Sequence, residues 1–311
     1  FPVETSAATV NRFCSSGLQS VAYASQAIIA GQGDAVMAGG IEMMSQVPMS
    51  GYNARLSPAM TESYIGMGAT AERVAKHWEI SRAAQDQHAY DSQQKAVSAI
   101  QRGAFTGQIV PIHTQRYTWK GAEKTVTDVV FDTDECPRAE TTLEGLAKLR
   151  PAFSPTGTVT AGNASPYSDG AAAVLLMSAA KAKALGVTPL ARFVSFAVAG
   201  VDPDIMGIGP IKAVPKALTR AGLTLADLKL IEFNEAFSAQ ALAVIKELGM
   251  DTSIINVNGG AIALGHPLGA TGAKLTTQLV HELRQRGGGY GMVTMCIGGG
   301  MGAAGIFEVY A

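Results

Sequence analysis

Four segments of the sequence contain residue types whose spacing could support covalent chemistry. One cysteine, Cys14, lies in residues 11–17 (NRFCSSG), and a second, Cys296, begins a run of glycines near the end of the chain. A histidine, His266, lies in a glycine-rich loop, and residues 234–237 (NEAF) supply an amide and a carboxylate. A cysteine beside a histidine permits nucleophilic catalysis, because the base generates a thiolate. A second cysteine adds a separate acid or base.

Each of these residues also has a purely structural alternative. Cys14 precedes a predicted helix, whose N–H groups and dipole favour a thiolate, but most free cysteines are buried apolar residues. Asn234 follows a predicted strand, where parallel sheets build their sites, but it would serve equally as a helix cap. His266 is fixed between a glycine and a proline in residues 259–269 (GGAIALGHPLG), which favours a positioned side chain, with a structural histidine as the alternative.

Other site patterns are absent or fail on context or spacing. Residues 300–305 match G-x-G-x-x-G, but a dinucleotide site needs that motif between a strand and a helix, and here a strand and the end of the chain follow. Residues 265–274 lack the spacing of a phosphate-binding loop, and no G-x-S-x-G motif occurs. His281-Glu282 lacks the second histidine of a zinc-protease helix, and the five histidines have no metal-ligand spacing. We therefore expect no metal site.

The composition restricts the class of protein. Of the 311 residues, 47% are hydrophobic and 16% are charged, against about 25% charged in an average soluble protein. These values exclude a disordered chain, and the net charge of −1 lacks the excess of positive charge typical of nucleic-acid-binding proteins. The longest apolar stretch, residues 171–177, is far too short to span a membrane. Three cysteines are too few for a disulfide framework, which favours a reducing compartment.

Strands and helices alternate on both sides of a polar central segment. Residues from about 48 to 151 carry most of the long polar stretches, and we interpret them as an insertion over the core. The alternation elsewhere predicts a largely parallel sheet covered on both faces. The predicted strands are 6–11, 35–38, 171–177, 191–199, 228–233, 253–257, 290–295 and 305–309. The predicted helices are 15–30, 81–102 with Ser81 as N-cap, one that ends at Leu185 before Gly186, 211–221, 238–248 and 271–286.

A faint internal repeat relates the two cysteine segments. Residues 11–40 contain Cys14, a glycine at the start of a buried helix, a strand and a glycine pair. Residues 269–299 contain a similar glycine, a helix, a strand, and Cys296 followed by glycines. Two such halves facing each other would place two helix N-termini and two glycine turns around one cleft.

Together, these segments resemble the thiolases. The family signatures lie around Cys14, at residues 234–237, at residues 265–267 (GHP) and around Cys296, in the family's order. Four further segments match as well: residues 66–72 (GMGATAE), 147–153 (AKLRPAF), 158–165 (TVTAGNAS) and 206–210 (MGIGP). The resemblance covers essentially the whole chain. It implies an α/β fold of duplicated α-β-α-β-α layers, with two mixed sheets around buried helices and an inserted loop domain.

The resemblance also implies a division into domains. Residues 1–49 and 168–189 would form the N-terminal half, residues 190–311 the C-terminal half, and residues 50–167 a loop domain that lies over the active site and binds CoA. Thiolases have two further strand–helix units before the nucleophile, whereas 13 residues precede Cys14 here. We therefore expect the N-terminal half to be incomplete at its start.

Thiolases cleave 3-ketoacyl-CoA with free CoA, giving acetyl-CoA and a shortened acyl-CoA through an acyl-cysteine. By position, the resemblance makes Cys14 the nucleophile, His266 its base and Cys296 the second acid/base. It implies that His266 and a water held by Asn234 bind the enolate oxygen. The backbone N–H groups of Cys14 and Gly298 would bind the tetrahedral oxyanion. No tightly bound cofactor is implied, since CoA and acyl-CoA are substrates.

Contacts with CoA are carried over by position. Arg138 matches a position that meets the 3′-phosphate, where a fixed cation suits a dianion. For Phe153 and Ser165, ordinary packing is the alternative. The full set of positions matched to substrate or CoA contacts is Met67, Arg138, Phe153, Ala161, Ser165, Met206 and Phe237.

Two departures bear on the subtype. Acetoacetyl-specific thiolases carry a histidine where this chain has Gly66, and the stretch between Pro48 and Gly66 is shorter here. Both features favour a 3-ketoacyl-CoA thiolase of fatty-acid β-oxidation over a biosynthetic acetyl-CoA acetyltransferase. A thiolase-like CoA or lipid carrier without turnover is an alternative of another class. A ketoacyl synthase is a third, although such enzymes lack a second catalytic cysteine like Cys296.

The expected partners follow from the same resemblance. We expect acyl-CoA substrates, a homodimer or homotetramer, and association with other β-oxidation enzymes, but no nucleic acid and no membrane span. A bacterial cytoplasmic location is favoured, and an organelle matrix stays open. The C-terminal residues 308–311 (EVYA) carry no peroxisomal tripeptide.

Overall fold

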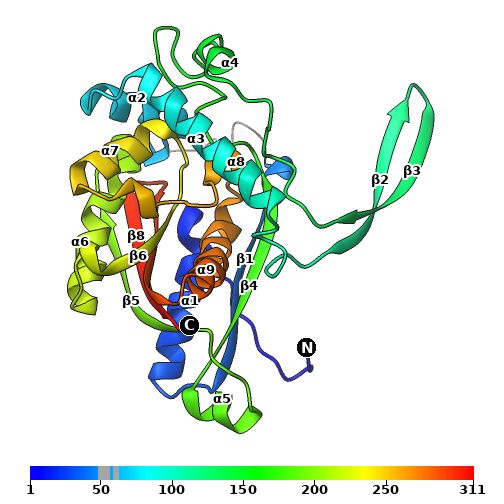
Figure 1. The fold of residues 1–311 in the computed structure, drawn as a ribbon, viewed down its shortest axis with the longest axis vertical. Helices are drawn as coiled ribbons and strands as arrows, with labels where there is room; N and C mark the ends of the chain where they lie inside the picture. Colours follow the sequence, from blue (N-terminus) through cyan, green and yellow to red (C-terminus); the bar gives the residue numbers. More distant parts are fainter. Residues whose placement is uncertain (48–56, 59–62) are drawn as a thin grey trace.

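The computed structural model describes residues 1–47, 57–58 and 63–311. Two helices, α1 (Ser16–Ile29) and α9 (Leu268–Gln285), lie side by side in the middle of the molecule, between two sheets (Figure 1). One sheet pairs β1 (Ala35–Met43) with β4 (Asp169–Met177). The other has four strands. This arrangement confirms the layered α/β fold with buried central helices.

The four-stranded sheet has the order β5-β8-β7-β6. Its strands are β5 (Ala191–Gly200), β6 (Leu228–Phe233), β7 (Gly289–Ile297) and β8 (Met301–Val309). Only β6 and β7 run parallel, because a short turn at residues 298–300 joins β7 to β8 and forces an antiparallel hairpin. The prediction of a largely parallel sheet is therefore wrong, and this sheet is mixed. Helices α6 (Gly209–Ala221) and α7 (Ser238–Leu248) pack against its outer face.

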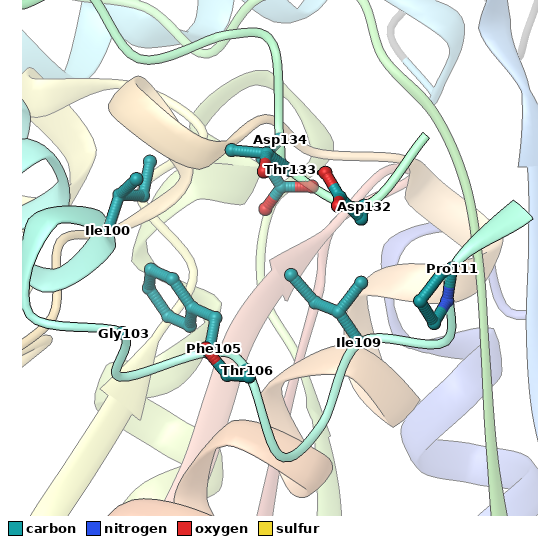
Figure 2. Close-up of a pocket in the computed structure, with 9 residues that line it drawn as sticks. All are labelled: Ile100, Gly103, Phe105, Thr106, Ile109, Pro111, Asp132, Thr133 and Asp134. Atoms are coloured by element: carbon teal, nitrogen blue, oxygen red, sulfur yellow. Dashed lines mark hydrogen bonds between the residues drawn. The ribbon is translucent and has the colours of Figure 1, made fainter. Parts of the chain in front are cut away.

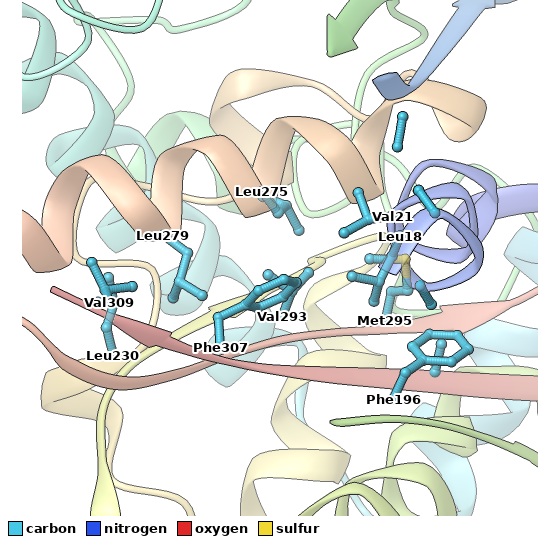
Figure 3. Packing of buried hydrophobic residues seen from close by; sticks show 14 of the residues in the cluster. Leu18, Val21, Phe196, Leu230, Leu275, Leu279, Val293, Met295, Phe307 and Val309 are labelled. Atoms are coloured by element: carbon cyan, nitrogen blue, oxygen red, sulfur yellow. The ribbon is translucent and has the colours of Figure 1, made fainter. Parts of the chain in front are cut away.

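The central helices approach each other closely at two glycines. A Cβ on Gly272 would lie 2.0 Å from the Leu18 nitrogen, and one on Gly17 would lie 2.6 Å from the Ala273 nitrogen. Each glycine lies in the first turns of its helix, so the repeat seen in the sequence corresponds to a symmetric helix crossing. Below the crossing, Leu275 and Leu279 of α9 pack onto the sheet (Figure 3).

The β1–β4 sheet is antiparallel throughout its nine residue pairs. Within the described residues this N-terminal sheet is therefore not mixed, unlike the C-terminal one. One face packs on the central helices through residues such as Ala38 and Val174. The opposite face exposes the apolar side chains of Met37, Ile41 and Leu175.

The described part of the segment between β1 and β4 contains three α-helices and a hairpin. Helix α3 (Arg82–Gln101) begins as predicted, with the Ser81 hydroxyl accepting the N–H of Ala84. The hairpin of β2 (Ile112–Lys120) and β3 (Glu123–Phe131), which the sequence analysis missed, extends away from the body (Figure 1). The other helices of the segment are α2 (Met67–His77) and α4 (Leu143–Ala147).

Two predicted strands are wrong. Residues 6–11 form no strand, since no neighbouring strand pairs with them. Residues 253–257 contain a short 3-10 helix (Thr252–Ile254) and one isolated bridge from Ile255 to β6, because the left-handed conformation of Asn256 (φ 44°) ends the extended chain. Predicted helices that follow β4 and the GHP loop are confirmed, with α5 (Ala179–Leu185) ending at left-handed Gly186. Most of the stretch from Pro48 to Gly66 lies outside the described residues.

No helix in the described part of the chain is long and apolar enough to cross a membrane.

Candidate active site

Four buried residues from four segments meet at one edge of the C-terminal sheet. Cys14 lies in the 3-10 turn that leads into α1, and Cys296 is the last residue but one of β7. Asn234 directly follows β6, and His266 lies between α8 (Ala261–Leu264) and α9. Since β6 and β7 are parallel, their carboxyl ends share an edge, where such sheets build sites. The contact between the first turns of α1 and α9 brings Cys14 to the same place.

Burial keeps both cysteines as thiols. It raises the pKa of Cys14 to about 11, although the N–H groups of Gly298 and Cys14 itself face the sulfur and pull the pKa down. Burial also raises the pKa of Cys296, and the neighbouring charge of a Cys14 thiolate raises it further. The two sulfurs are therefore close enough to influence each other, and the two N–H donors are arranged to stabilise negative charge at Cys14.

Hydrogen bonds determine the tautomer of His266. Its Nδ1 lies 2.6 Å from the Thr271 hydroxyl, which itself lies 2.9 Å from the Pro267 carbonyl oxygen. A carbonyl oxygen only accepts, so the hydroxyl proton goes to Pro267 and Nδ1 must donate to Thr271. Nε2 then carries a lone pair, and it accepts from Asn234 Nδ2 at 3.3 Å. The unprotonated nitrogen of His266 is thus Nε2, and Asn234 is its hydrogen-bond donor.

Burial also keeps this base neutral. Desolvation, followed by the charge of Lys274, lowers the pKa of His266 to about 3. In the described residues no hydrogen bond joins Cys14 to His266, and such contacts often tighten only when substrate is bound. The Oδ1 atom of Asn234 is buried and has no hydrogen-bond partner among the residues that the structure describes, so it can accept from a water or a ligand.

The loop that carries His266 is held from three sides. The Ser168 hydroxyl accepts the His266 N–H at 3.2 Å, and Lys274 Nζ donates to the Leu264 carbonyl at 2.9 Å. Thr271 fixes the ring, as described above. The sequence analysis missed these three supports, although Thr271 and Lys274 lie in the first turns of a predicted helix just after the histidine.

A second network fixes Asn234. The Asn256 side chain binds both the N–H and the carbonyl of Phe233, each at 2.7 Å, and its Nδ2 also donates to Glu235 at 2.7 Å. The Glu235 carboxylate accepts the Ser92 hydroxyl at 2.8 Å as well. Although burial alone would raise the pKa of Glu235, nearby His88 and these donors lower it overall. The buried carboxylate therefore stays charged and locks the turn that follows β6.

The residues matched to CoA contacts divide into two groups. Met206 and Phe237 pack in one apolar cluster with Cys296, and Met67 packs against that cluster. The Phe153 ring meets Phe237 edge-on, with centroids 6.0 Å apart. These four residues thus lie beside the second cysteine.

The other three matched positions lie further out. The Ser165 N–H donates to the Ala236 carbonyl at 3.0 Å, which joins its loop to residues 234–237, and Ala161 is exposed. The Arg138 backbone N–H donates to Gln93 on α3, and its side chain is at the surface. The structure thus leaves Arg138 outside the cluster around Cys296.

A cavity of about 220 Å³ lies beside the base of the hairpin (Figure 2). Its walls include Phe105 and Ile109 from the loop after α3 and Asp132 and Asp134 from the segment after β3. None of the predicted site residues lines it, so we do not assign the chemistry to it. In the described ranges no group of three or more His, Cys, Asp or Glu side chains could hold a metal ion.

Comparison with protein families agrees with this geometry. The model "Thiolase, N-terminal domain" matches residues 1–180, and "Thiolase, C-terminal domain" matches residues 187–309. The chain belongs to the thiolase family.

Similar proteins include both kinds of thiolase. The chain is 54% identical to the 3-ketoacyl-CoA thiolase of Bacillus subtilis over 99% of its own length and 80% of that protein. It is 49% identical to the acetyl-CoA acetyltransferase of Rhizobium meliloti, over 97% of this thiolase and 79% of the relative. Among solved structures, the dimeric peroxisomal thiolase of Saccharomyces cerevisiae superimposes with a TM-score of 0.89 at 42% identity, covering 96% of this chain and 75% of that one.

Proposed function

We propose that this thiolase is a 3-ketoacyl-CoA thiolase, an acyltransferase that cleaves 3-ketoacyl-CoA with CoA into acetyl-CoA and a shortened acyl-CoA. The observation that carries the proposal is the meeting of Cys14, Cys296, His266 and Asn234 in one buried site. The high identity to the Bacillus subtilis 3-ketoacyl-CoA thiolase supports the subtype. CoA and acyl-CoA enter as substrates, as the name of that relative suggests.

The first half-reaction forms an acyl-enzyme. As Cys14 Sγ attacks the C3 carbonyl of the substrate, its proton passes to His266 Nε2, the unprotonated ring nitrogen. The N–H groups of Cys14 and Gly298 stabilise the alkoxide that forms at C3. Breaking the C2–C3 bond leaves an acyl-Cys14 thioester and the enolate of acetyl-CoA. Cys296 then gives its proton to the enolate carbon.

The enolate oxygen needs donors before that proton arrives. After taking the Cys14 proton, His266 Nε2–H is one donor. A water is the second, giving one hydrogen to the unpartnered Oδ1 of Asn234 and the other to the enolate oxygen.

The second half-reaction returns the enzyme to its starting state. The Cys296 thiolate takes the thiol proton of incoming CoA, and the CoA sulfur attacks the acyl-Cys14 carbonyl. The shortened acyl-CoA leaves, and Cys14 recovers its proton from His266. Protons balance over the two halves. Because acetyl-CoA leaves the acyl-enzyme before CoA enters, the kinetics are ping-pong.

The inserted segment would provide the CoA site. We propose the division into residues 1–49 with 168–189, 50–167, and 190–311, because β1 pairs with β4 and thereby makes residues 50–167 an excursion from one sheet. Within it, Met67 and Phe153, with Met206 and Phe237, would line the pantetheine channel beside Cys296. The exposed Arg138 would meet the 3′-phosphate, with Ala161 and Ser165 on the intervening surface.

We also propose a homodimer or homotetramer in the bacterial cytoplasm, which associates with other β-oxidation enzymes. The dimeric state of the yeast structure supports the oligomer, and the bacterial origin of the Bacillus subtilis relative supports the bacterial location. Sedimentation equilibrium tests the first, and a monomer at micromolar concentration would contradict it.

The subtype is tested by thiolysis of 3-ketoacyl-CoA substrates from four to sixteen carbons. We expect kcat/KM to remain high beyond four carbons. Activity confined to acetoacetyl-CoA would favour the second candidate, an acetyl-CoA acetyltransferase, to which the chain is also about half identical. Cys14→Ala tests catalysis itself: thiolysis and the acyl-enzyme are lost while CoA binding persists. A carrier without turnover would show no thiolysis even in the unaltered protein.

A further inference from the structure

The residue before the nucleophile has an unusual backbone conformation. Phe13 has φ 45°, in the left-handed region that glycine favours and bulky side chains avoid. Among the described residues only Glu79 and Asn256 share this property without being glycine. The Phe13 ring is 47% exposed, so its packing does not explain the conformation. Something else must maintain the strain next to Cys14.

Two polar side chains bind the backbone on both sides of Phe13. The Asn11 Oδ1 atom accepts the Phe13 N–H at 2.8 Å. The Ser16 hydroxyl donates to the Phe13 carbonyl at 2.8 Å and accepts the Arg12 N–H at 2.9 Å. The Phe13 N–H is therefore satisfied by a side chain, and its carbonyl accepts both the hydroxyl and the backbone N–H of Ser16.

The bond from Ser16 also determines where the Cys14 N–H points. The Phe13 carbonyl and the Cys14 N–H belong to one planar trans peptide, in which the two groups point in opposite directions. Fixing the carbonyl toward the Ser16 hydroxyl therefore turns the Cys14 N–H the other way. That N–H faces the Cys14 sulfur, together with the N–H of Gly298.

We propose that Asn11 and Ser16 are positioning residues, which hold Phe13 in the left-handed conformation and so direct the Cys14 N–H toward the reacting oxyanion. This inference rests on the proposed function, because the Cys14 N–H is one of the two donors that the proposed mechanism assigns to the oxyanion. Neither residue touches the reacting atoms; both act through the peptide between Phe13 and Cys14.

The test compares Asn11→Ala and Ser16→Ala with the unaltered protein. We expect kcat for thiolysis to fall about 10- to 100-fold with KM nearly unchanged, since a small misplacement of a catalytic group has this effect. Ser16→Thr keeps the hydroxyl and should retain activity. Thermal unfolding of each variant shows whether the fold is intact.

A rescue experiment separates backbone strain from other effects. In the Asn11→Ala background, Phe13→Gly should restore most of the lost kcat, because glycine adopts a positive φ without a Cβ clash. Phe13→Ala in the same background should not, because alanine keeps the Cβ while removing the ring. Glu79→Gly, at an exposed left-handed residue far from the cysteines in sequence, is the matched control and should leave kcat unchanged.

A readout without substrate distinguishes failure of this inference from failure of the proposed function. Turning away one N–H donor should slow alkylation of Cys14 by iodoacetamide at pH 8.5 by about tenfold, the effect of one hydrogen bond to a charge. If the unaltered protein lacks thiolysis but the variants show this slowing, the proposed function fails and the inference stands. Folded variants with unchanged alkylation and kcat, or equal rescue by Phe13→Ala and Phe13→Gly, overturn it.

Discussion

The C-terminal sheet is covered on both faces, by α6 and α7 on one side and by the α1–α9 pair on the other, whereas the described residues cover the β1–β4 sheet on one face only. Each half nevertheless contributes a glycine in the first turns of its central helix, where the two helices cross. They differ in what they give the site. Asn234, His266 and Cys296 come from the fully covered half, and Cys14 comes from the other. Cys14 thus depends on the helix crossing for its place near Cys296.

The largest expected effect is a loss of kcat when Cys296, which comes from the covered half, is replaced. Cys296→Ala removes the proposed acid/base and should lower kcat by about 10²- to 10⁴-fold, the usual contribution of such a group. Iodoacetamide should still label Cys14, because Cys14 comes from the other half. Cys136→Ala, at the third cysteine, should change kcat by less than about twofold. Loss of Cys14 labelling in Cys296→Ala would contradict this separation.

The same substitution in the two halves sharpens the structural side of the comparison. Leu279→Ala, in the packed layer between α9 and the C-terminal sheet, should lower the free energy of unfolding by about 2–5 kcal/mol. Leu175 lies on the outer face of β4 and is 60% exposed, so Leu175→Ala should change the free energy of unfolding by less than about 0.5 kcal/mol. Denaturant unfolding measures both. Similar losses at the two positions would show that the outer face of β1–β4 is covered in solution.

The pH dependence of alkylation tests whether Cys14, from one half, is a thiol or is ion-paired with His266, from the other half, before substrate binds. Because burial raises the pKa of Cys14 to about 11, the thiolate fraction grows about tenfold for each pH unit below that value. The rate of iodoacetamide labelling at Cys14 should therefore rise steadily from pH 7 to pH 10. Cys14→Ala supplies the background from the other cysteines. A plateau between pH 6 and pH 8 would instead indicate a preformed thiolate–imidazolium pair.

The smallest effect concerns the tautomer of the base. Thr271→Val removes the acceptor of His266 Nδ1–H and should lower kcat by about tenfold, the value of one hydrogen bond. Thr277→Val is the matched control, since Thr277 makes the same kind of bond to the carbonyl four residues earlier on α9. A loss of kcat that is equal in the two variants would mean that the helix, rather than the imidazole, is affected.

Much of this site could be predicted from short sequence motifs, because its cysteine, histidine and glycine residues lie at the ends of strands and helices. The predicted bounds of strands β6 and β7 and of helices α7 and α9 agree with the structure within a few residues. The direction of β8 was not, since it depends on the short turn after β7. The β2–β3 hairpin was missed because its strands are exposed on nearly every side chain and lack an apolar alternation.

Support residues were harder to predict than reacting ones. Ser168 and Lys274 hold the His266 loop through backbone groups, and a bond to a backbone carbonyl or N–H leaves no pattern in the sequence. The left-handed conformation of Phe13 is likewise invisible in its residue type. Such contacts arise from tertiary structure, which brings together segments that are far apart in the chain.

The two buried thiols bear on how the protein would withstand chemical damage. Oxidation by peroxide proceeds through the thiolate and needs access to solvent. Cys14 and Cys296 are both buried and both protonated at neutral pH, so the resting site offers an oxidant little to react with. The burial that keeps Cys14 protonated should therefore also slow its oxidation while no substrate is bound.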